Sequence, residues 1–256
     1  MMKLAEKSYM SLLLFGAMMT ATIMQSGSAR AQQASASAGQ NDVTAIDILL
    51  DPDATMIQHA TAANAKLLQS YPKGFTLGGA HAPHVSMLQR YVKTADLPKV
   101  FAAADKVFAK ENATSWKLTA YRYAYTGKAK MGDQTVSVGN ILVKTTPDLL
   151  RLQQELIDAV TPFTSPKGTS AAFVTTPQDP DIVPELIPYV AEFVLAHSGK
   201  HFVPHVSIGV GATDLLDKMG AAPFHDFTFS PVGASIYHLG NYGTAMNKLH
   251  SISLKH

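Results

Sequence analysis

Apolar and polar positions alternate with two different periods along most of the chain. Short runs with strand-like patterns are separated by segments whose apolar residues recur at helical spacing. The predicted strands cover residues 45–50, 84–92, 115–127, 135–145, 205–211 and 224–241. The predicted helices cover residues 54–71, 96–110, 147–160, 182–198 and 212–220. We therefore expect a mixed fold in which strands and helices alternate around one hairpin.

Several residues mark where these elements begin and end. Asp53 is placed to cap helix 54–71, and Pro72 disfavours its continuation. Pro188 predicts a kink or a restart in the fourth helix. The segment 161–180 is rich in Pro, Thr and Ser, so we expect a loop or the connection between two lobes there.

Two predicted strands carry the same four residues. Pro-His-Val-Ser occurs at Pro83–Ser86 and again at Pro204–Ser207. Residues two apart in a strand share a face, so each motif presents its histidine and serine together and points its valine into a core. One motif lies early in the chain and one lies late, which predicts two similar lobes.

The paired motifs supply groups that suit a phosphodiester. If the two strands face one cleft, four side chains converge on it, namely His84, His205, Ser86 and Ser207. Hydroxyl groups and a protonated imidazole bind non-bridging oxygens through hydrogen bonds. A neutral histidine takes a proton from the attacking oxygen and a protonated one gives a proton to the leaving oxygen, since imidazole has a reference pKa of about 6.5. This chemistry needs no metal and no cofactor.

Apolar residues flank both motifs, which occur in the stretches APHVSML and FVPHVSIG. These motifs resemble the paired H-x-[ST]-x motifs of the two-histidine (2H) phosphoesterase superfamily, which includes bacterial 2'-5' RNA ligase proteins and cyclic nucleotide phosphodiesterases. The resemblance spans the chain from Ala45 to about His238. It implies an α+β, bilobal and pseudo-symmetric fold in which two antiparallel sheets face a central cleft, with the helices outside. Both motifs use Ser where Thr is commoner in that family.

The resemblance also implies a role for each site residue. The first histidine of such a pair is generally the proton donor, so His84 would be the acid and His205 the base. Ser86 and Ser207 would bind the phosphate. The implied protein is an exported, metal-independent phosphodiesterase that hydrolyses a cyclic phosphate of the 2',3'-cyclic nucleotide or RNA-end type. The alternative is a non-catalytic periplasmic binding protein that uses the same cleft for a small phosphorylated ligand.

Residues 1–31 have the features of a secretory signal peptide. Lys3 and Lys7 precede an apolar run at Leu12–Met24, and an Ala-x-Ala site follows at Ala29–Ala31. Cleavage there would leave a periplasmic or secreted protein that is not bound to a membrane. A transmembrane anchor is the alternative, but the run is shorter than the roughly 20 residues of a spanning helix.

We expect one domain in the rest of the chain. Residues 32–42 predict a disordered leader, and residues 43–256 predict a single bilobal domain. The chain has 21 basic and 19 acidic residues, and the predicted signal peptide holds three of the former and one of the latter, so the remainder is balanced. This balance argues against duplex nucleic acid as a ligand. We expect a monomer that acts on a small phosphorylated or cyclic-nucleotide substrate.

The spacing of three histidines raises a metal site as a competing interpretation. His197, His201 and His205 are four apart, as on one face of a helix, but Gly199 and Pro204 interrupt such a helix. The chain contains no cysteine, which excludes a disulfide and a thiolate metal site. We therefore expect no metal site.

Two further sets of side chains have both a functional and a structural interpretation. Tyr121, Tyr123 and Tyr125 would share one face of a strand, where they could stack on a base or pack within the hairpin. Packing is the favoured interpretation. By strand alternation Arg90 would share the face of His84, where it could reach a phosphate or lie in solvent.

Overall fold

The computed structural model describes residues 42–177 and 179–255, which belong to one compact unit that spans Ala38–His256. The predicted signal peptide and the predicted leader, Asp42 excepted, lie outside the described residues, so export stays a prediction. The strands are β1 (Val43–Pro52), β2 (Val85–Lys93), β3 (Leu118–Met131), β4 (Gln134–Val143), β5 (Thr164–Ser165), β6 (His205–Ala212), β7 (Phe227–Phe229), β8 (Pro231–Leu239) and β9 (Ala245–Ile252). The helices are α2 (Ala54–Ser70), α3 (Leu97–Phe108), α4 (Pro147–Val160), α5 (Leu186–His197) and α6 (Thr213–Ala221).

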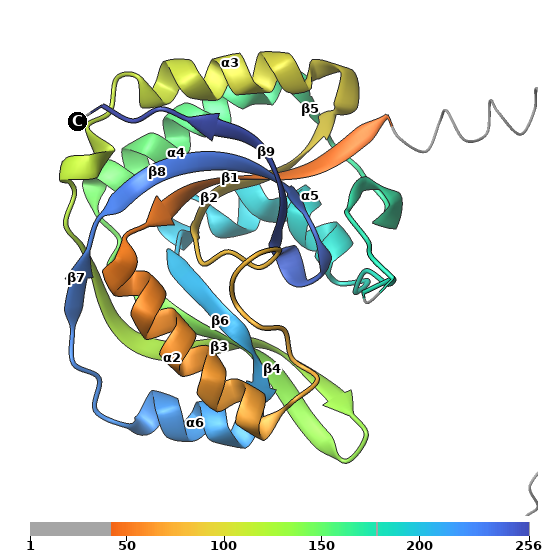
Figure 1. The fold of residues 1–256 in the computed structure, drawn as a ribbon. Coiled ribbons are helices and arrows are strands. Elements are labelled where there is room, and N and C mark those ends of the chain that lie inside the picture. Colours follow the sequence, from red (N-terminus) through yellow and green to blue (C-terminus); the bar gives the residue numbers. More distant parts are fainter. Residues whose placement is uncertain (1–41, 178, 256) are drawn as a thin grey trace, which may run out of the picture. The chain divides into compact units, whose positions relative to one another are not determined.

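These strands form two antiparallel sheets (Figure 1). The first sheet has the order β5-β2-β1-β8-β9, and the second sheet has the order β6-β4-β3-β7. One Pro-His-Val-Ser motif lies at the start of β2 in the first sheet and the other at the start of β6 in the second. The predicted α+β fold with two antiparallel sheets is confirmed.

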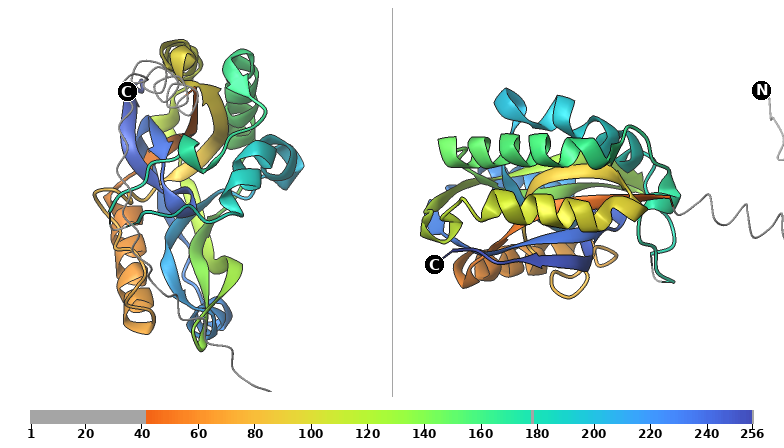
Figure 2. Two further views of the ribbon diagram at one scale, coloured as in Figure 1. Left: turned by 90° about the vertical axis from the view of Figure 1, so that its right-hand side faces the viewer. Right: turned by 90° about the horizontal axis from the view of Figure 1, so that it is seen from above.

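The first helix of each lobe packs on the sheet of the other lobe (Figures 1 and 2). Helix α2 follows β1 of the first sheet, yet Leu67 of α2 lies over the second sheet, where a Cβ at Gly139 or Gly211 would come within 3.1 or 2.8 Å of it. Helix α4 follows β4 of the second sheet, yet Gln153 of α4 donates a hydrogen bond of 3.1 Å to the carbonyl of Met87 in β2. The two lobes therefore interlock rather than lie beside each other.

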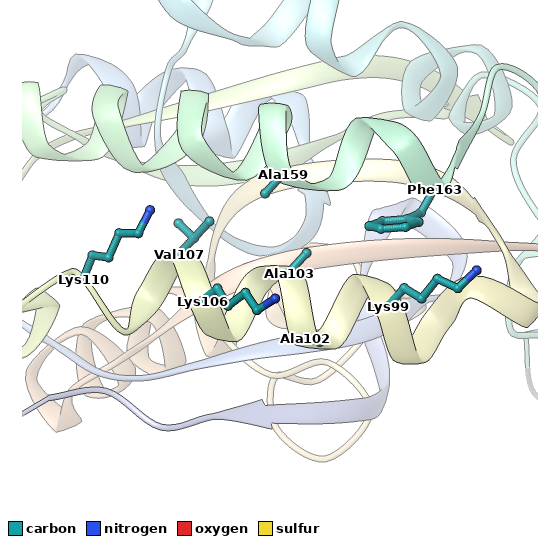
Figure 3. A pocket seen from close by; sticks show the side chains of 8 residues that line it. All are labelled: Lys99, Ala102, Ala103, Lys106, Val107, Lys110, Ala159 and Phe163. Carbon is teal, nitrogen blue, oxygen red and sulfur yellow. The ribbon is translucent and has the colours of Figure 1, made fainter.

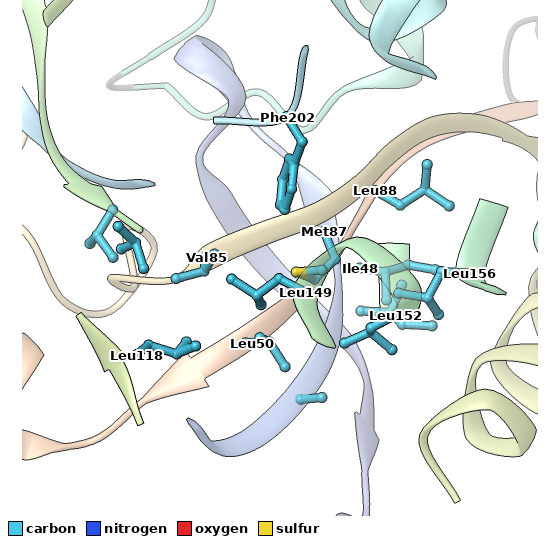
Figure 4. Close-up of a cluster of buried hydrophobic side chains, with 14 of the residues drawn as sticks. Ile48, Leu50, Val85, Met87, Leu88, Leu118, Leu149, Leu152, Leu156 and Phe202 are labelled. Carbon is cyan, nitrogen blue, oxygen red and sulfur yellow. The ribbon is translucent and has the colours of Figure 1, made fainter. Parts of the chain in front are cut away.

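One buried apolar cluster joins both sheets and fixes the orientation of the motif strands (Figure 4). Val85 and Val206, the valines of the two motifs, are both fully buried in it. Leu149 and Leu152 of α4 pack in the same cluster, beside Met87 of β2. Because the valine of each motif is held in the core, its histidine and serine face the opposite side, as strand alternation predicts.

Caps and prolines set the helix boundaries. The Asp53 carboxylate accepts hydrogen bonds from the backbone of Thr55 and Met56, which confirms the predicted cap of α2. Helix α5 starts at Leu186, later than predicted, and Pro188 is its third residue. An N–H at that position has no partner within a helix, so the first turn accommodates the proline without loss of a hydrogen bond. No helix in the described part of the chain has the length and apolar character to cross a bilayer.

Two strands were not predicted. The first is β5, which lies in the expected loop 161–180 and pairs with Tyr91 and Val92 at the edge of the first sheet. The second is β9, which pairs with β8 across two register shifts. Each shift reverses the alternation of inward and outward side chains, which removes the period-two pattern on which the prediction depended.

Candidate active site

The two motifs adopt the same local structure in the two sheets. Ser86 lies opposite Leu49 of β1, and Ser207 lies opposite Asn140 of β4. In each motif strand the register then shifts by one residue immediately after the serine, which is the signature of a β-bulge. The repeated sequence thus corresponds to a repeated strand geometry.

Each motif histidine is held by a carbonyl two residues earlier in the chain. Nδ1 of His84 lies 2.7 Å from the carbonyl oxygen of Ala82, and Nδ1 of His205 lies 2.8 Å from that of Val203. Both carbonyls precede the proline of the motif, and a residue before proline is restricted to extended conformations. A carbonyl oxygen only accepts, so Nδ1 carries the hydrogen and Nε2 is left to donate or accept. The proline of the motif thus helps to orient the imidazole.

Residues of both motifs line one small cavity. His84 and Ser207, from different sheets, lie in its wall together with His81, Phe75 and Tyr242. Its volume of about 20 Å³ is enough for about one water molecule. The cavity shows that the first and second sheets meet at the motifs.

The other two predicted residues, Ser86 and His205, lie beside this cavity rather than in its wall. Ser86 Oγ donates a 2.5 Å hydrogen bond to Asp47 Oδ2, the same oxygen that faces Nε2 of His84 at 3.5 Å. His205 is half-buried and lies close enough to His84 for the charge of one to affect the other. All four predicted side chains therefore belong to one neighbourhood.

Asp47 of β1 is the central polar residue of this neighbourhood. Its side chain is fully buried, and its Oδ2 atom accepts hydrogen bonds from Ser86 Oγ and from Gln89 Nε2, the latter at 3.0 Å. Its Oδ1 atom is buried without a hydrogen-bond partner among the described residues. A buried carboxylate of this kind favours a positive charge on the adjacent His84.

The two histidines differ in their affinity for a proton. Burial acts to lower the pKa of His84, but the adjacent Asp47 carboxylate, the bond to Ala82 and the charge of Asp51 together raise that pKa above 6.5. Burial lowers the pKa of His205 below 6.5, with a further contribution from the charge of His84 and a partly opposing one from its bond to Val203. Between the two pKa values His84 therefore holds a proton while His205 is neutral.

The serine of the second motif donates to a neutral side chain, whereas the serine of the first donates to a carboxylate; Asn140 lies directly opposite Ser207, and Asp47 lies opposite Gln89. Ser207 Oγ donates a hydrogen bond of 3.0 Å to Asn140 Oδ1. Asn140 is buried in β4, as Asp47 is buried in β1. Each motif serine is therefore oriented by a side-chain oxygen of the neighbouring strand, but the oxygen carries a negative charge only in the first sheet.

Helix α5 supplies the residues next to this pair. The ring centroids of Tyr189 and His197 are 4.4 Å apart. Burial, with a contribution from the charge of Asp47, raises the pKa of Tyr189 to about 12. Burial lowers the pKa of His197, which in turn affects His205. Tyr189 is therefore a neutral hydroxyl close to the site at physiological pH.

The bulge after Ser86 changes which side chains accompany His84. It places Gln89 opposite Asp47 and Arg90 opposite Ile46, on the core side of β1. Arg90 instead donates a hydrogen bond of 3.1 Å to Thr164 Oγ1 of β5. The expectation that Arg90 shares the face of His84 is therefore wrong, because strand alternation fails across a bulge.

The three tyrosines of β3 pack against neighbouring side chains, as the favoured interpretation predicts. Tyr125 Oη donates a hydrogen bond of 2.8 Å to Asp217 of α6, and the ring of Tyr123 meets that of Phe224 edge-on at 5.0 Å. Tyr121 lies beneath the guanidinium group of Arg122. These contacts occupy the rings within the second sheet and its covering helix.

The three evenly spaced histidines do not lie on one helix. Helix α5 ends at His197, a 3₁₀ turn covers Gly199–His201, and His205 begins β6. Within residues 42–177 and 179–255, no three His, Asp or Glu side chains are grouped so that they could hold a metal ion.

A larger groove lies elsewhere, between α3 and α4 (Figure 3). It has a volume of about 460 Å³, and its lining includes Lys99, Lys106, Lys110 and Phe163. Lys99 is already paired with Asp96 at 2.7 Å. The groove lacks the convergent buried polar groups of the motif cavity, so its size does not make it the better candidate.

Sequence reasoning missed three residues of the site, namely Asp47, Gln89 and Asn140. One signal was present, since Asp47 is a single acidic residue inside the apolar run AIDILL. A charge in such a strand is costly unless it is paired, and therefore indicates a partner. Gln89 gave no comparable signal, because it reaches Asp47 only through the bulge.

The fold and the site define a two-lobed α+β protein in which a motif histidine of one lobe and a motif serine of the other line a shared cavity. No family model and no curated protein matches the chain. Among solved structures, the crystal structure of TT0787 of Thermus thermophilus is similar, with a TM-score of 0.44 and 13% sequence identity. The match covers 82% of this chain and 98% of that chain. Neither an activity nor a substrate of this chain follows from it.

Proposed function

We propose that the protein is an exported phosphodiesterase that opens a cyclic phosphate by acid–base catalysis with two histidines. The observation that carries the proposal is the matched pair of imidazoles, each tied through Nδ1 to a carbonyl so that Nε2 remains for chemistry. The pKa values of the pair are displaced in opposite directions, as a donor and an acceptor require. The resemblance to the two-histidine phosphoesterases and the predicted signal peptide support the same proposal.

The reaction assigns one proton transfer to each histidine. Neutral His205 removes a proton from water through Nε2 while the water oxygen bonds to phosphorus. Protonated His84 donates the proton on its Nε2 to the ribose oxygen as the P–O bond to that oxygen breaks. The product is a phosphate monoester with a free hydroxyl, and solvent then returns both histidines to their starting states. A serine hydroxyl has one hydrogen to donate, so Ser86 and Ser207 turn theirs from Asp47 and Asn140 to the non-bridging oxygens when the phosphate binds.

The rate should depend on pH as a bell. The active form needs His84 charged and His205 neutral. Because the pKa of His84 is raised and that of His205 is lowered, this form predominates between the two values. Activity falls below the lower pKa as His205 gains a proton and above the higher pKa as His84 loses one. Both limbs belong to the coupled pair.

Hydrolysis of a panel of 2',3'-cyclic nucleotides by the purified mature chain tests the proposal. His84→Ala and His205→Ala should each reduce kcat by ~10²–10⁴-fold, and the double variant should lose far less than the product of the two factors. Ser86→Ala and Ser207→Ala should cost less. His225→Ala is the matched control, because His225 is exposed. EDTA should leave the rate unchanged.

Three results would change the assignment. Activity that survives His205→Ala but is lost with EDTA would point to a metal site. Tight binding of a cyclic nucleotide without turnover by the unaltered chain would favour the periplasmic binding protein. An intact Met1 on protein from the native host, in place of a start near Gln32, would contradict export.

A further inference from the structure

The two lobes differ in the group that accepts the hydrogen bond of the motif serine, a difference that the repeated motif does not encode. In the first lobe the motif serine, Ser86, donates to a carboxylate oxygen of Asp47. In the second lobe the motif serine, Ser207, donates to an amide oxygen of Asn140. Asp47 is fully buried and Asn140 nearly so. Of the two groups that accept from the motif serines, only the one in the first lobe can carry a negative charge.

Every polar contact of Asp47 directs that charge toward the first motif. Its Oδ2 atom receives hydrogen bonds from Ser86 and Gln89 and lies 3.5 Å from Nε2 of His84. Two neutral donors on one oxygen hold the carboxylate in place without cancelling its charge. A buried carboxylate favours the charged form of a neighbouring imidazole more strongly than an exposed one, since water screens it less.

We propose that Asp47 is the positioning residue that assigns the acid role to His84, and that the neutral Asn140 leaves the base role to His205. The inference rests on the proposed two-histidine mechanism, and it deepens it, because the direction of proton transfer comes from the strands beside the motifs. The motifs themselves are identical over Pro-His-Val-Ser and supply no such difference.

Other charged or titratable groups act on the same pair more weakly. The charge of Asp51 in β1 also contributes to the raised pKa of His84, after Asp47. The pKa of His205 is affected by His84, Asp47 and His197, in that order, after burial and the Val203 hydrogen bond. Among the charges acting on the pair, Asp47 is the one that lies within ion-pair distance of an imidazole among the described residues, 3.5 Å from Nε2 of His84.

Histidine titrations followed by NMR on the unliganded mature chain test this inference without any substrate. In the unaltered chain His84 should titrate at higher pH than His205. Asp47→Asn keeps an acceptor for Ser86 and removes the charge, so the titration of His84 should move to lower pH. Asn140→Asp places a carboxylate behind the second motif, so the titration of His205 should move to higher pH. Asp133→Asn, in the exposed β3–β4 turn, is the control and should move neither.

Kinetics then separate a positioning role from a structural one. Above the pKa of His84 its protonated fraction falls about tenfold per pH unit, so Asp47→Asn should shift the alkaline limb by the displacement seen in the NMR titration. At a pH above the pKa of His84 in the unaltered chain, kcat should fall by the matching factor with KM nearly unchanged. A merely structural role would lower activity at every pH without moving the limb.

Clear outcomes would overturn the inference. If Asp47→Asn is folded and both histidines titrate as in the unaltered chain, Asp47 does not set the roles. If Asp47→Asn does not fold, Asn140→Asp decides, and an unchanged His205 titration counts against the inference. If the titrations move as expected but no cyclic phosphate is hydrolysed, the proposed function fails while the charge asymmetry stands.

Discussion

Replacing Asn64 by Ala should destabilise the protein by about 3 kcal/mol. The buried amide of Asn64 in α2 makes three hydrogen bonds to distant backbone groups. Its Nδ2 atom donates to the carbonyls of Phe75 at 3.0 Å and Ile208 at 2.9 Å, and its Oδ1 atom accepts from the N–H of Leu77 at 3.1 Å. Ile208 is the bulge residue that follows Ser207. One side chain thus holds both a cavity loop and a motif strand.

The magnitude follows from these three bonds. A net contribution of about 1 kcal/mol for each gives about 3 kcal/mol, and more where a backbone group is left buried without a partner. For a domain of this size 1 kcal/mol corresponds to roughly 2–4 °C in Tm, so the expected fall is roughly 6–12 °C. Because the anchored groups border the site, kcat should also fall.

Urea denaturation provides the assay. The midpoint for Asn64→Ala should fall while the slope m stays constant, since the surface exposed on unfolding is unchanged. Asn247→Ala, at an exposed position of β9, is the matched control and should change the free energy of unfolding by less than about 0.5 kcal/mol. A loss for Asn64→Ala as small as that of the control would refute the reasoning.

Two further predictions concern buried tyrosines. Gly168→Ala should destabilise the protein by ~1–3 kcal/mol, because a Cβ there would lie 2.2 Å from Cε1 of the buried Tyr91, and unchanged urea denaturation would contradict this contact. Burial raises the pKa of Tyr91 and, with Asp47, that of Tyr189 to about 12, so an absorbance titration should show two phenols ionising after the others. The unfolded chain releases these protons near pH 10, so stability should fall between about pH 10 and 12, and Tyr189→Phe should reduce that fall.

Local sequence patterns predicted most helices and strands, but not how these elements pack against one another, because packing depends on contacts between distant parts of the chain. The alternating periods located β1, β2, α2 and α4 to within a few residues, because each follows from side chains near in sequence. The exchange of α2 and α4 between the sheets depends on which faces meet in three dimensions. No spacing within a single helix carries that information.

The candidate site divides in the same way. The repeated tetrad identified His84 and His205, and the Pro-His step accounts for the orientation of each ring. The partners on the neighbouring strands, Asp47 and Asn140, depend on register, and the bulge after each serine changes that register. Counting alternate residues along β2 therefore placed Arg90 on the wrong face and did not predict that Gln89 contacts Asp47.

The pairing of β1 with β8 has a consequence for how the chain is made. On one side β1 pairs with β2, but its other neighbour is β8, which is followed only by β9 near the C-terminus. During synthesis from the N-terminus, β1 thus has an open edge until almost the whole chain has left the ribosome. The first sheet is therefore completed last, because β8 and β9 are synthesised long after the first Pro-His-Val-Ser motif. Because the first sheet is completed so late, the chain stays unfolded for most of its synthesis, which is the state in which a polypeptide can pass through a narrow channel.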